Sequence, residues 1–179
     1  MIEKIDFSIL NFIQAHLRCS FLDHIMPWIT KCGDSGFIWL ILGALLVMFR
    51  RTRRCGISEV LAITGGFVIC NMMLKNLIQR SRPCWLEPLS DMLIAVPADY
   101  SFPSGHSMAS FAAASVIFQY NRRAGAAALA FAGLIALSRM YLYVHFPTDV
   151  LCGALLGIFM GIITVKLFEK YIDTGESEA

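Results

Sequence analysis

Five long apolar stretches, separated by short polar segments, constrain the fold of this chain more than any other feature. They lie at residues 35–49, 56–74, 107–120, 124–144 and 150–168. Because a helix that crosses a bilayer needs about 20 mostly apolar residues, each stretch can supply most of one span. A soluble domain would interrupt such runs with polar side chains every few positions. The sequence therefore predicts an all-α fold, a polytopic transmembrane helical bundle of five to six spans.

The composition agrees with a membrane protein and argues against nucleic-acid binding. Hydrophobic residues make up 57% of the chain and charged residues 16%, against about 45–50% and about 25% in a typical soluble domain. The formal net charge is only +2, whereas binding of nucleic acid needs a concentrated basic surface. Five spans leave about 80 residues for loops and ends. We therefore expect residues 1–179 to form a single integral membrane domain.

Residues 1–33 are expected to form an interfacial helix and a second helix that leads into the membrane. One helical stripe of apolar side chains supports the interfacial helix; its members are Ile5, Ile9, Phe12, Ile13 and Leu17. The competing interpretation is a sixth span built from residues 5–30. Against it stand polar and ionisable side chains that are costly in hydrocarbon, namely Asp6, His16, Arg18, Asp23 and His24.

Arginine clusters predict how the chain is oriented in the membrane. One cluster lies at 50–54, between the first and second spans, and Arg122 and Arg123 lie between the third and fourth. Loops rich in Arg and Lys stay in the cytoplasm. The loops at 79–102 and 144–149 are then expected on the non-cytoplasmic side.

A group of ionisable residues lies in or beside these two loops. Ionisable groups near the ends of spans are costly unless they pair or serve a site, so they form a functional hypothesis by default. We expect them to meet in space at one end of the bundle. They are Lys75, Arg80, Arg82, Asp99, His106, Arg139, His145 and Asp149.

Two sequence features within this set favour an anion site. Lys75 and Arg82 are seven residues apart, and Pro83 is expected to end the helix at Arg82. Ser104 and Gly105 precede an apolar run, where a helix start offers free backbone N–H groups to an anion. The simpler alternatives are two cations that snorkel at a helix end and an ordinary helix cap.

The anion bound by such cations and N–H groups could be a phosphoryl group. Two histidines add the groups that its transfer would need. His145 and Asp149 are four residues apart, and Pro147 fits between them if a helix begins there. The carboxylate could then bind one imidazole nitrogen and leave the other as a nucleophile. A purely structural His–Asp pair is the alternative. With His106 as a second histidine, one could attack phosphorus while the other protonates the departing oxygen.

We expect no metal and no cofactor in this reaction. No cluster of carboxylates is evident that could hold Mg²⁺ or Zn²⁺. The cations Lys75, Arg82 and Arg139 could instead stabilise the charge of the phosphoryl group.

With these residues identified, the chain resembles the type 2 phosphatidic acid phosphatase (PAP2) superfamily, which includes bacterial membrane lipid phosphatases and vanadium haloperoxidases. Three motifs of that family occur in order over residues 75–149. The first, a lysine, six residues and Arg-Pro, runs from Lys75 to Arg82-Pro83. The second, Pro-Ser-Gly-His, occupies residues 103–106. The third comprises Ser138-Arg139, His145 after five further residues, and Asp149 after three more.

The resemblance implies a role for each motif residue. His145 would be the nucleophile that forms a phosphohistidine, Asp149 would orient it, and His106 would protonate the leaving group. The phosphate-binding residues would be Lys75, Arg82, Ser104, Gly105 and Arg139.

The predicted function is that of a membrane lipid phosphatase in the cell membrane, with its site on the non-cytoplasmic side and an isoprenyl (undecaprenyl) diphosphate as substrate. A phosphatidylglycerophosphate, phosphatidic acid or lipid A phosphatase is the alternative within the family. A non-catalytic lipid-binding or transport protein is the alternative of another class. The expected partners are the lipid phosphate and the bilayer, and the oligomeric state stays open.

Overall fold

A computed structural model describes residues 2–176, and within this range the chain forms helices and no strands. This confirms the all-α class. The helices, in order, are α1 (Ile2–His16), α2 (Ser20–Cys32), the 3₁₀-helix η1 (Asp34–Gly36), α3 (Phe37–Met48), α4 (Arg53–Phe67), the π-helix η2 (Val68–Leu74), α5 (Lys75–Ile78), α6 (Pro83–Leu86), α7 (Gly105–Tyr120), α8 (Arg122–Tyr141) and α9 (Pro147–Glu176).

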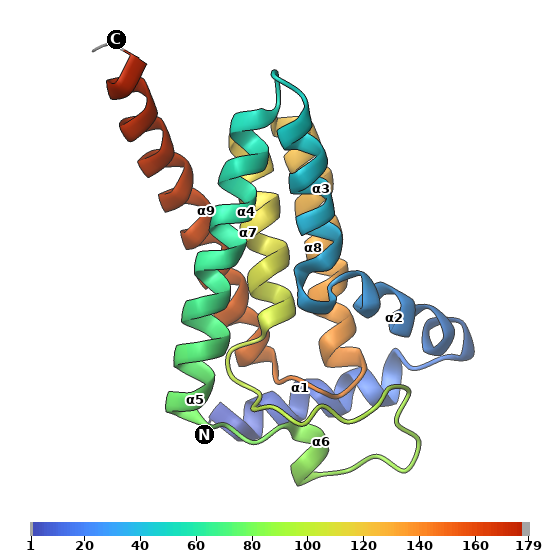
Figure 1. The fold of residues 1–179 in the computed structure, drawn as a ribbon. Coiled ribbons are helices and arrows are strands. Elements are labelled where there is room, and N and C mark those ends of the chain that lie inside the picture. Colours follow the sequence, from blue (N-terminus) through green and yellow to red (C-terminus); the bar gives the residue numbers. More distant parts are fainter. Residues whose placement is uncertain (1, 177–179) are drawn as a thin grey trace.

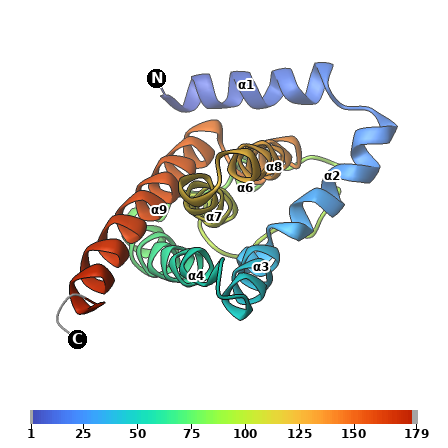
Figure 2. The same ribbon diagram turned by 90° about the horizontal axis from the view of Figure 1, so that it is seen from above.

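Helix α7 is the centre of the bundle, and α4, α8 and α9 pack around it (Figures 1 and 2). Its middle residues, Ala112, Ala113 and Ala114, are completely buried. Glycines let α9 approach closely, since a Cβ at Gly157 would come within 2.3 Å of the Met108 carbonyl oxygen. Small residues at such contacts are typical of helices that pack inside membranes.

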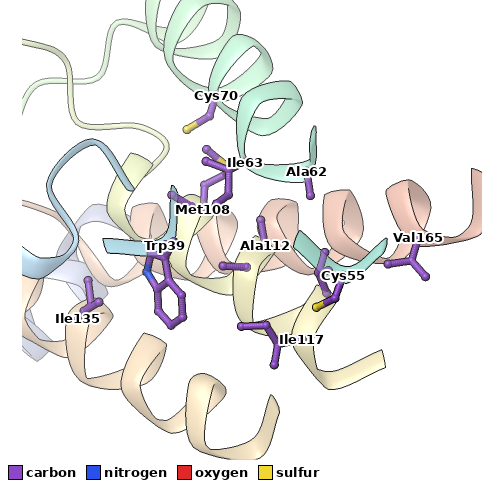
Figure 3. Close-up of a cluster of buried hydrophobic side chains, with 13 residues drawn as sticks. Trp39, Cys55, Ala62, Ile63, Cys70, Met108, Ala112, Ile117, Ile135 and Val165 are labelled. Atoms are coloured by element: carbon purple, nitrogen blue, oxygen red, sulfur yellow. The ribbon is translucent and has the colours of Figure 1, made fainter. Parts of the chain in front are cut away.

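Larger side chains fill the space between α3, α4 and α7. Figure 3 shows Trp39, Ile63 and Met108 in this cluster, together with Cys70 from η2. Trp39 also donates a hydrogen bond from Nε1 to the Ser110 hydroxyl at 3.0 Å, so its polar atom is satisfied within the bundle. This core fixes α7 relative to α4, and both helices lead into the site described below.

Three segments of the described chain are long and apolar enough to cross a membrane, namely Arg53–Leu86, Arg122–Tyr141 and Pro147–Tyr171. The bent pair of α2 and α3 would add a fourth. The predicted stretches at 35–49 and 107–120 correspond to α3, with 12 residues, and α7, with 16. Both are shorter than a full span. The structure therefore supports three to four spans, and five to six stays a prediction.

The N-terminal segment forms two helices rather than one. Residues 17–19 separate α1 from α2, so residues 5–30 are not a single straight span. Helix α1 lies at the level of one end of the bundle (Figure 1), along the side formed by α8 and α9 (Figure 2), and its Leu10 and Ile13 are buried. Its outer face carries the exposed side chains of Ile5, Ile9 and Phe12. This geometry suits an interfacial helix, whose place in the membrane stays a prediction.

Helix α5 ends sooner than the sequence predicts. It stops at Ile78, and Gln79 adopts a left-handed conformation with φ 51°. Arg82 is extended and stands just before α6, where Pro83 occupies the first turn. Lys75 and Arg82 consequently do not share a helix. The chain between α5 and α6 turns so that the two side chains come close together. Helix α9, in contrast, begins at Pro147, as predicted.

Candidate active site

A cavity of about 440 Å³ lies at the end of the bundle where the loop 79–104 crosses it. Six of the eight predicted site residues line this cavity, namely Lys75, Arg82, Gly105, His106, Arg139 and His145. The other two, Ser104 and Asp149, are completely buried and are not part of its lining. The structure thus brings together the three sequence motifs around one space.

Each motif reaches the cavity from a different element. Lys75 begins α5, and Arg82 precedes α6. Gly105 and His106 open α7, Arg139 lies in the last turn of α8, and His145 is in the connection between α8 and α9. Loop and helix ends at one end of the bundle therefore build the site.

Ser104 caps α7 in this structure. Its Oγ accepts hydrogen bonds from the Ser107 backbone N–H at 3.4 Å and from the Ser107 hydroxyl at 3.0 Å. The capping alternative thus describes the observed side chain, and a contact of Ser104 with phosphate stays a prediction. A Cβ at Gly105 would lie 2.8 Å from Oδ1 of Asn71, which also lines the cavity, so a larger residue there would displace the Asn71 side chain.

Arg82 is held rigidly beside His145. Its side chain is 2% exposed, and it donates to the backbone oxygens of Asp99 at 2.6 Å and Val144 at 2.7 Å. Its Nη1 also lies 3.1 Å from Nε2 of His145. Because a guanidinium can only donate, Nε2 of His145 is the acceptor in this contact, so it is unprotonated and its lone pair points to Arg82. The remaining imidazole proton is then on Nδ1.

Ser101 connects His145 to Asp149. The Asp149 carboxylate is 3.7 Å from Nδ1 of His145, so the direct hydrogen bond expected from the sequence is not made. Instead Oγ of Ser101 donates to Oδ2 of Asp149 at 2.5 Å and lies 3.4 Å from Nδ1 of His145. Ser101 is not predicted from the sequence, since a serine two residues before a proline has no distinctive signature.

His106 has a carboxylate partner of its own. Its Nε2 lies 2.8 Å from Oδ1 of Asp34, a residue of η1 that also lines the cavity. A carboxylate only accepts, so Nε2 of His106 carries a proton in this contact. Asp34 was also missed, because in sequence it looks like an ordinary polar residue before an apolar run.

Asp99 joins the two cations on the loop side of the cavity. Its carboxylate pairs with the Lys75 ammonium and accepts from Nη2 of Arg82 at 2.7 Å. Burial acts to raise the pKa of Asp99, but the hydrogen bond from Lys75 and the charge of Arg82 outweigh it and lower this pKa to about 2. Asp99 is therefore ionised at neutral pH.

His145 is neutral at the same pH. Burial lowers its pKa well below 6.5, and the positive charges of Arg82, Arg139 and Lys75 act in the same direction. A neutral imidazole with its lone pair on Nε2 is the form that can attack an electrophile.

Arg139 lines the cavity together with the cations Lys75 and Arg82. It is 4% exposed, and its Nη1 donates to the Thr30 hydroxyl at 2.5 Å. Its Nε has no partner among the described residues. Three cations around a space that also contains the start of α7 favour an anionic ligand with several oxygens.

Within residues 2–176 no group of three or more His, Cys, Asp or Glu side chains stands close enough together to hold a metal ion.

Comparison with known proteins identifies the family. Residues 56–173 match the PAP2 superfamily. The chain is 30% identical over 162 residues to an undecaprenyl-diphosphatase from Sulfolobus acidocaldarius, an alignment that covers 90% of this chain and 76% of the relative. It is 32% identical over 170 residues to phosphatidylglycerophosphatase B from Bacillus subtilis, which covers 87% and 79% of the two chains.

A solved structure gives the same result for the fold. The crystal structure of LpxE from Aquifex aeolicus is similar with a TM-score of 0.79 and 31% identity. The match covers 90% of this chain and 95% of that one.

Proposed function

The chain belongs to the PAP2 superfamily, among its membrane lipid phosphatases, and on this basis we propose that it hydrolyses an isoprenyl diphosphate, such as undecaprenyl diphosphate, through a phosphohistidine at His145. One observation carries the proposal. Nε2 of His145 lies 3.1 Å from Arg82 at a cavity whose lining also includes Lys75, Arg139 and His106.

In the first step Nε2 of His145 attacks the terminal phosphorus, and the bond from phosphorus to the bridging oxygen breaks. Lys75, Arg82 and Arg139 stabilise the charge on the phosphoryl oxygens. A doubly protonated His106 keeps one N–H on Asp34 and gives its other proton to the departing oxygen. The Asp149 carboxylate, through Ser101, stabilises the positive charge that develops on the His145 ring.

In the second step water replaces His145 on phosphorus. The now neutral His106 accepts a proton from this water as its oxygen attacks. The bond from phosphorus to Nε2 breaks, and the lone pair returns to His145. Orthophosphate and the lipid monophosphate are the products, and no proton or electron is left unbalanced.

The choice of lipid rests on the character of the cavity. Part of its lining is apolar, with Ile63, Phe67 and Met108, which suits the first carbons of a lipid chain. The three cations suit a diphosphate, which carries more charge than a monoester. Similarity to an undecaprenyl-diphosphatase supports this choice, whereas similarity to phosphatidylglycerophosphatase B keeps phosphatidylglycerophosphate and phosphatidic acid as alternatives. Lipid A is a further candidate.

We also propose that the site faces the non-cytoplasmic side of the cell membrane. The arginine-rich turns at 50–54 and 121–123 lie at the end of the bundle opposite the site (Figure 1), as the positive-inside rule requires. A cysteine-free variant carrying Ser90→Cys should react with an impermeant thiol reagent in intact cells, and one carrying Arg51→Cys should not. Both positions are exposed. Labelling of residue 51 but not residue 90 would reverse the orientation.

The function is tested by phosphate release from purified protein. The substrates are undecaprenyl diphosphate, phosphatidylglycerophosphate, phosphatidic acid and lipid A, each with and without EDTA. We expect the fastest release from the isoprenyl diphosphate and no effect of EDTA. Activity that disappears in EDTA would contradict the metal-free mechanism. Binding of a lipid without release of phosphate from any of them would favour the non-catalytic alternative.

A further inference from the structure

The N-terminal helix reaches the proposed catalytic carboxylate through a single arginine. Asp6 is the only acidic residue of α1 that is buried, and its side chain is 1% exposed. Figures 1 and 2 show α1 beside the end of the bundle at which α9 begins. An aspartate is rarely buried so completely unless it is paired, which directs attention to its partners.

Arg80 bridges two buried carboxylates that belong to different helices. Its Nη2 donates to Oδ2 of Asp6 at 2.6 Å, and its Nη1 donates to Oδ1 of Asp149 at 2.5 Å. The guanidinium also stacks on the ring of Phe146, 4.1 Å from its centroid. With one arm on each carboxylate and its face on an aromatic ring, Arg80 is fixed in position.

Asp6 also holds the first turn of α9. Its Oδ1 accepts from the Thr148 backbone N–H at 3.1 Å, and its Oδ2 accepts from the Thr148 hydroxyl at 2.6 Å. A carboxylate from another helix thus satisfies an N–H group that the start of α9 leaves without a helical partner. The segment from His145 to Asp149 is consequently held from α1.

Three hydrogen bonds fix the orientation of the Asp149 carboxylate. Oδ1 accepts from Arg80, while Oδ2 accepts from the Ser101 hydroxyl at 2.5 Å and from the Phe146 backbone N–H at 3.0 Å. Neither Asp6 nor Arg80 lines the cavity, so neither contacts a phosphate bound there. Their influence on the reaction passes through Asp149 and Ser101 to His145.

We propose that Asp6 and Arg80 are a positioning pair, through which α1 fixes the orientation and the effective charge of Asp149 behind His145. This inference rests on the proposed phosphatase function. The two carboxylates and one guanidinium carry a net charge of about −1 behind the imidazole ring. Without Asp6, Arg80 would neutralise Asp149 alone; without Arg80, Asp149 would lose the donor that orients Oδ1.

If Asp6 and Arg80 act on His145 through their charges, replacing them should shift the protonation of His145 in opposite directions. A merely structural contact would not produce such opposite shifts. Asp6→Asn removes a negative charge and keeps the shape, so it should disfavour the protonated His145. Arg80→Gln removes a positive charge and should favour it. The acidic limb of the pH profile of kcat/KM should therefore move to lower pH in the first variant and to higher pH in the second, by about 0.5 to 1 pH unit. The other ionisable groups that face His145 are unchanged in both variants, namely Lys75, Arg82, His106, Arg139 and Asp149 itself.

Turnover should fall in both variants with little change in KM, because the pair does not touch the substrate. We expect kcat to decrease about 10- to 100-fold, as it does when the hydrogen-bond partners of metal ligands are removed. Asp91→Asn is the matched control, since it breaks an ion pair from Arg18 that also ties the N-terminal segment to the loop but contacts no site residue. It should leave kcat and the pH profile as in the wild type.

The experiment measures kcat, KM and the pH profile of lipid diphosphate hydrolysis, with the melting temperature of each variant in detergent. Opposite displacement of the two acidic limbs, with the Asp91→Asn profile unmoved, supports the proposal. Limbs that stay in place or move in the same direction overturn it, even if kcat falls with the melting temperature. If Arg80→Gln does not fold, Arg80→Lys is used in its place. This variant keeps the charge, so kcat should fall while the acidic limb of the pH profile stays in place. An unchanged kcat in Arg80→Lys overturns the proposal. Wild-type protein without phosphatase activity would instead refute the proposed function.

Discussion

The Asp149 carboxylate lies 3.7 Å from Nδ1 of His145, and the hydroxyl of Ser101 stands between them. The contact that orients the imidazole is therefore indirect. The lone pair on Nε2 faces Arg82, and the proton on Nδ1 faces Ser101. Ser101 therefore belongs to the candidate active site, although it lies outside the three sequence motifs.

Ser101→Ala should lower kcat/KM about 10-fold or more. The change removes the hydroxyl that links Nδ1 of His145 to Asp149, and it leaves a buried carboxylate oxygen with one donor fewer. The measurement is steady-state hydrolysis of the lipid diphosphate. Ser115→Ala is the control, because that hydroxyl is also largely buried but bonds to Ile158 away from the site. Equal activity of the two variants would exclude a role for Ser101 in orienting His145.

His106→Gln should lower kcat/KM for a lipid phosphomonoester such as phosphatidic acid, whose leaving group is a basic alkoxide, by about 10²–10⁴-fold, which is the usual contribution of a general acid. The loss should be much smaller with p-nitrophenyl phosphate, because nitrophenolate leaves without needing a proton. Asp34→Asn should show the same pattern with a smaller loss, since it removes the carboxylate that holds Nε2 of His106. The measurement is the ratio of the kcat/KM values for the two substrates, because kcat/KM reports the departure of the leaving group and not the later hydrolysis, in which His106 acts as a base on both. An equal loss on both substrates would show that His106 acts in binding rather than as an acid.

His145 should contribute to the decrease in the free energy of unfolding at acidic pH. Its pKa in the folded protein is held well below 6.5 by burial and by neighbouring cations. Between these two values the unfolded chain binds more protons, so the free energy of unfolding decreases as the pH falls below about 6.5. His145→Gln should remove this part of the dependence. Melting temperatures of both proteins at pH 7.5 and 5.5 provide the measurement, and an equal drop in both would contradict the assignment.

Asp99→Asn should strengthen inhibition by orthophosphate. Asp99 pairs with Lys75 and Arg82, so a bound phosphate competes with it for the same cations. Loss of the carboxylate raises the positive charge of the site, and the inhibition constant should fall several-fold at low salt. High salt should reduce the difference, and Asp91→Asn in the same loop should show none. Weaker inhibition in Asp99→Asn would mean that this carboxylate orients the cations rather than competing with the ligand.

The meeting of the motif residues in space could be predicted from the sequence, because the apolar stretches determine which helix ends lie on the same side; the roles of these residues stay predictions. Lys75, His106 and Arg139 lie at the ends of three helices, α5, α7 and α8, and they line one cavity. Pro147 begins α9 because a proline fits the first turn of a helix, where no N–H donor is needed.

The parts that could not be predicted depend on the path of loops and on long-range pairing. Gln79 ends α5 in a left-handed conformation without the glycine that usually marks such an end. Asp34 and Ser101 are single polar residues that acquire their partners only when distant segments come together. Asp6 was counted only as a cost for a membrane span, whereas its burial is explained by Arg80 and Thr148, more than 70 residues away.

The most direct test of the account is to trap the covalent intermediate. Wild-type protein is mixed with an isoprenyl diphosphate labelled with ³²P on the terminal phosphate and is quenched in alkali within milliseconds. We predict an acid-labile, alkali-stable label on the peptide that contains His145, and no label in His145→Ala. Label on a different residue, or phosphate release at the wild-type rate by His145→Ala, would contradict the central claim that His145 is the nucleophile.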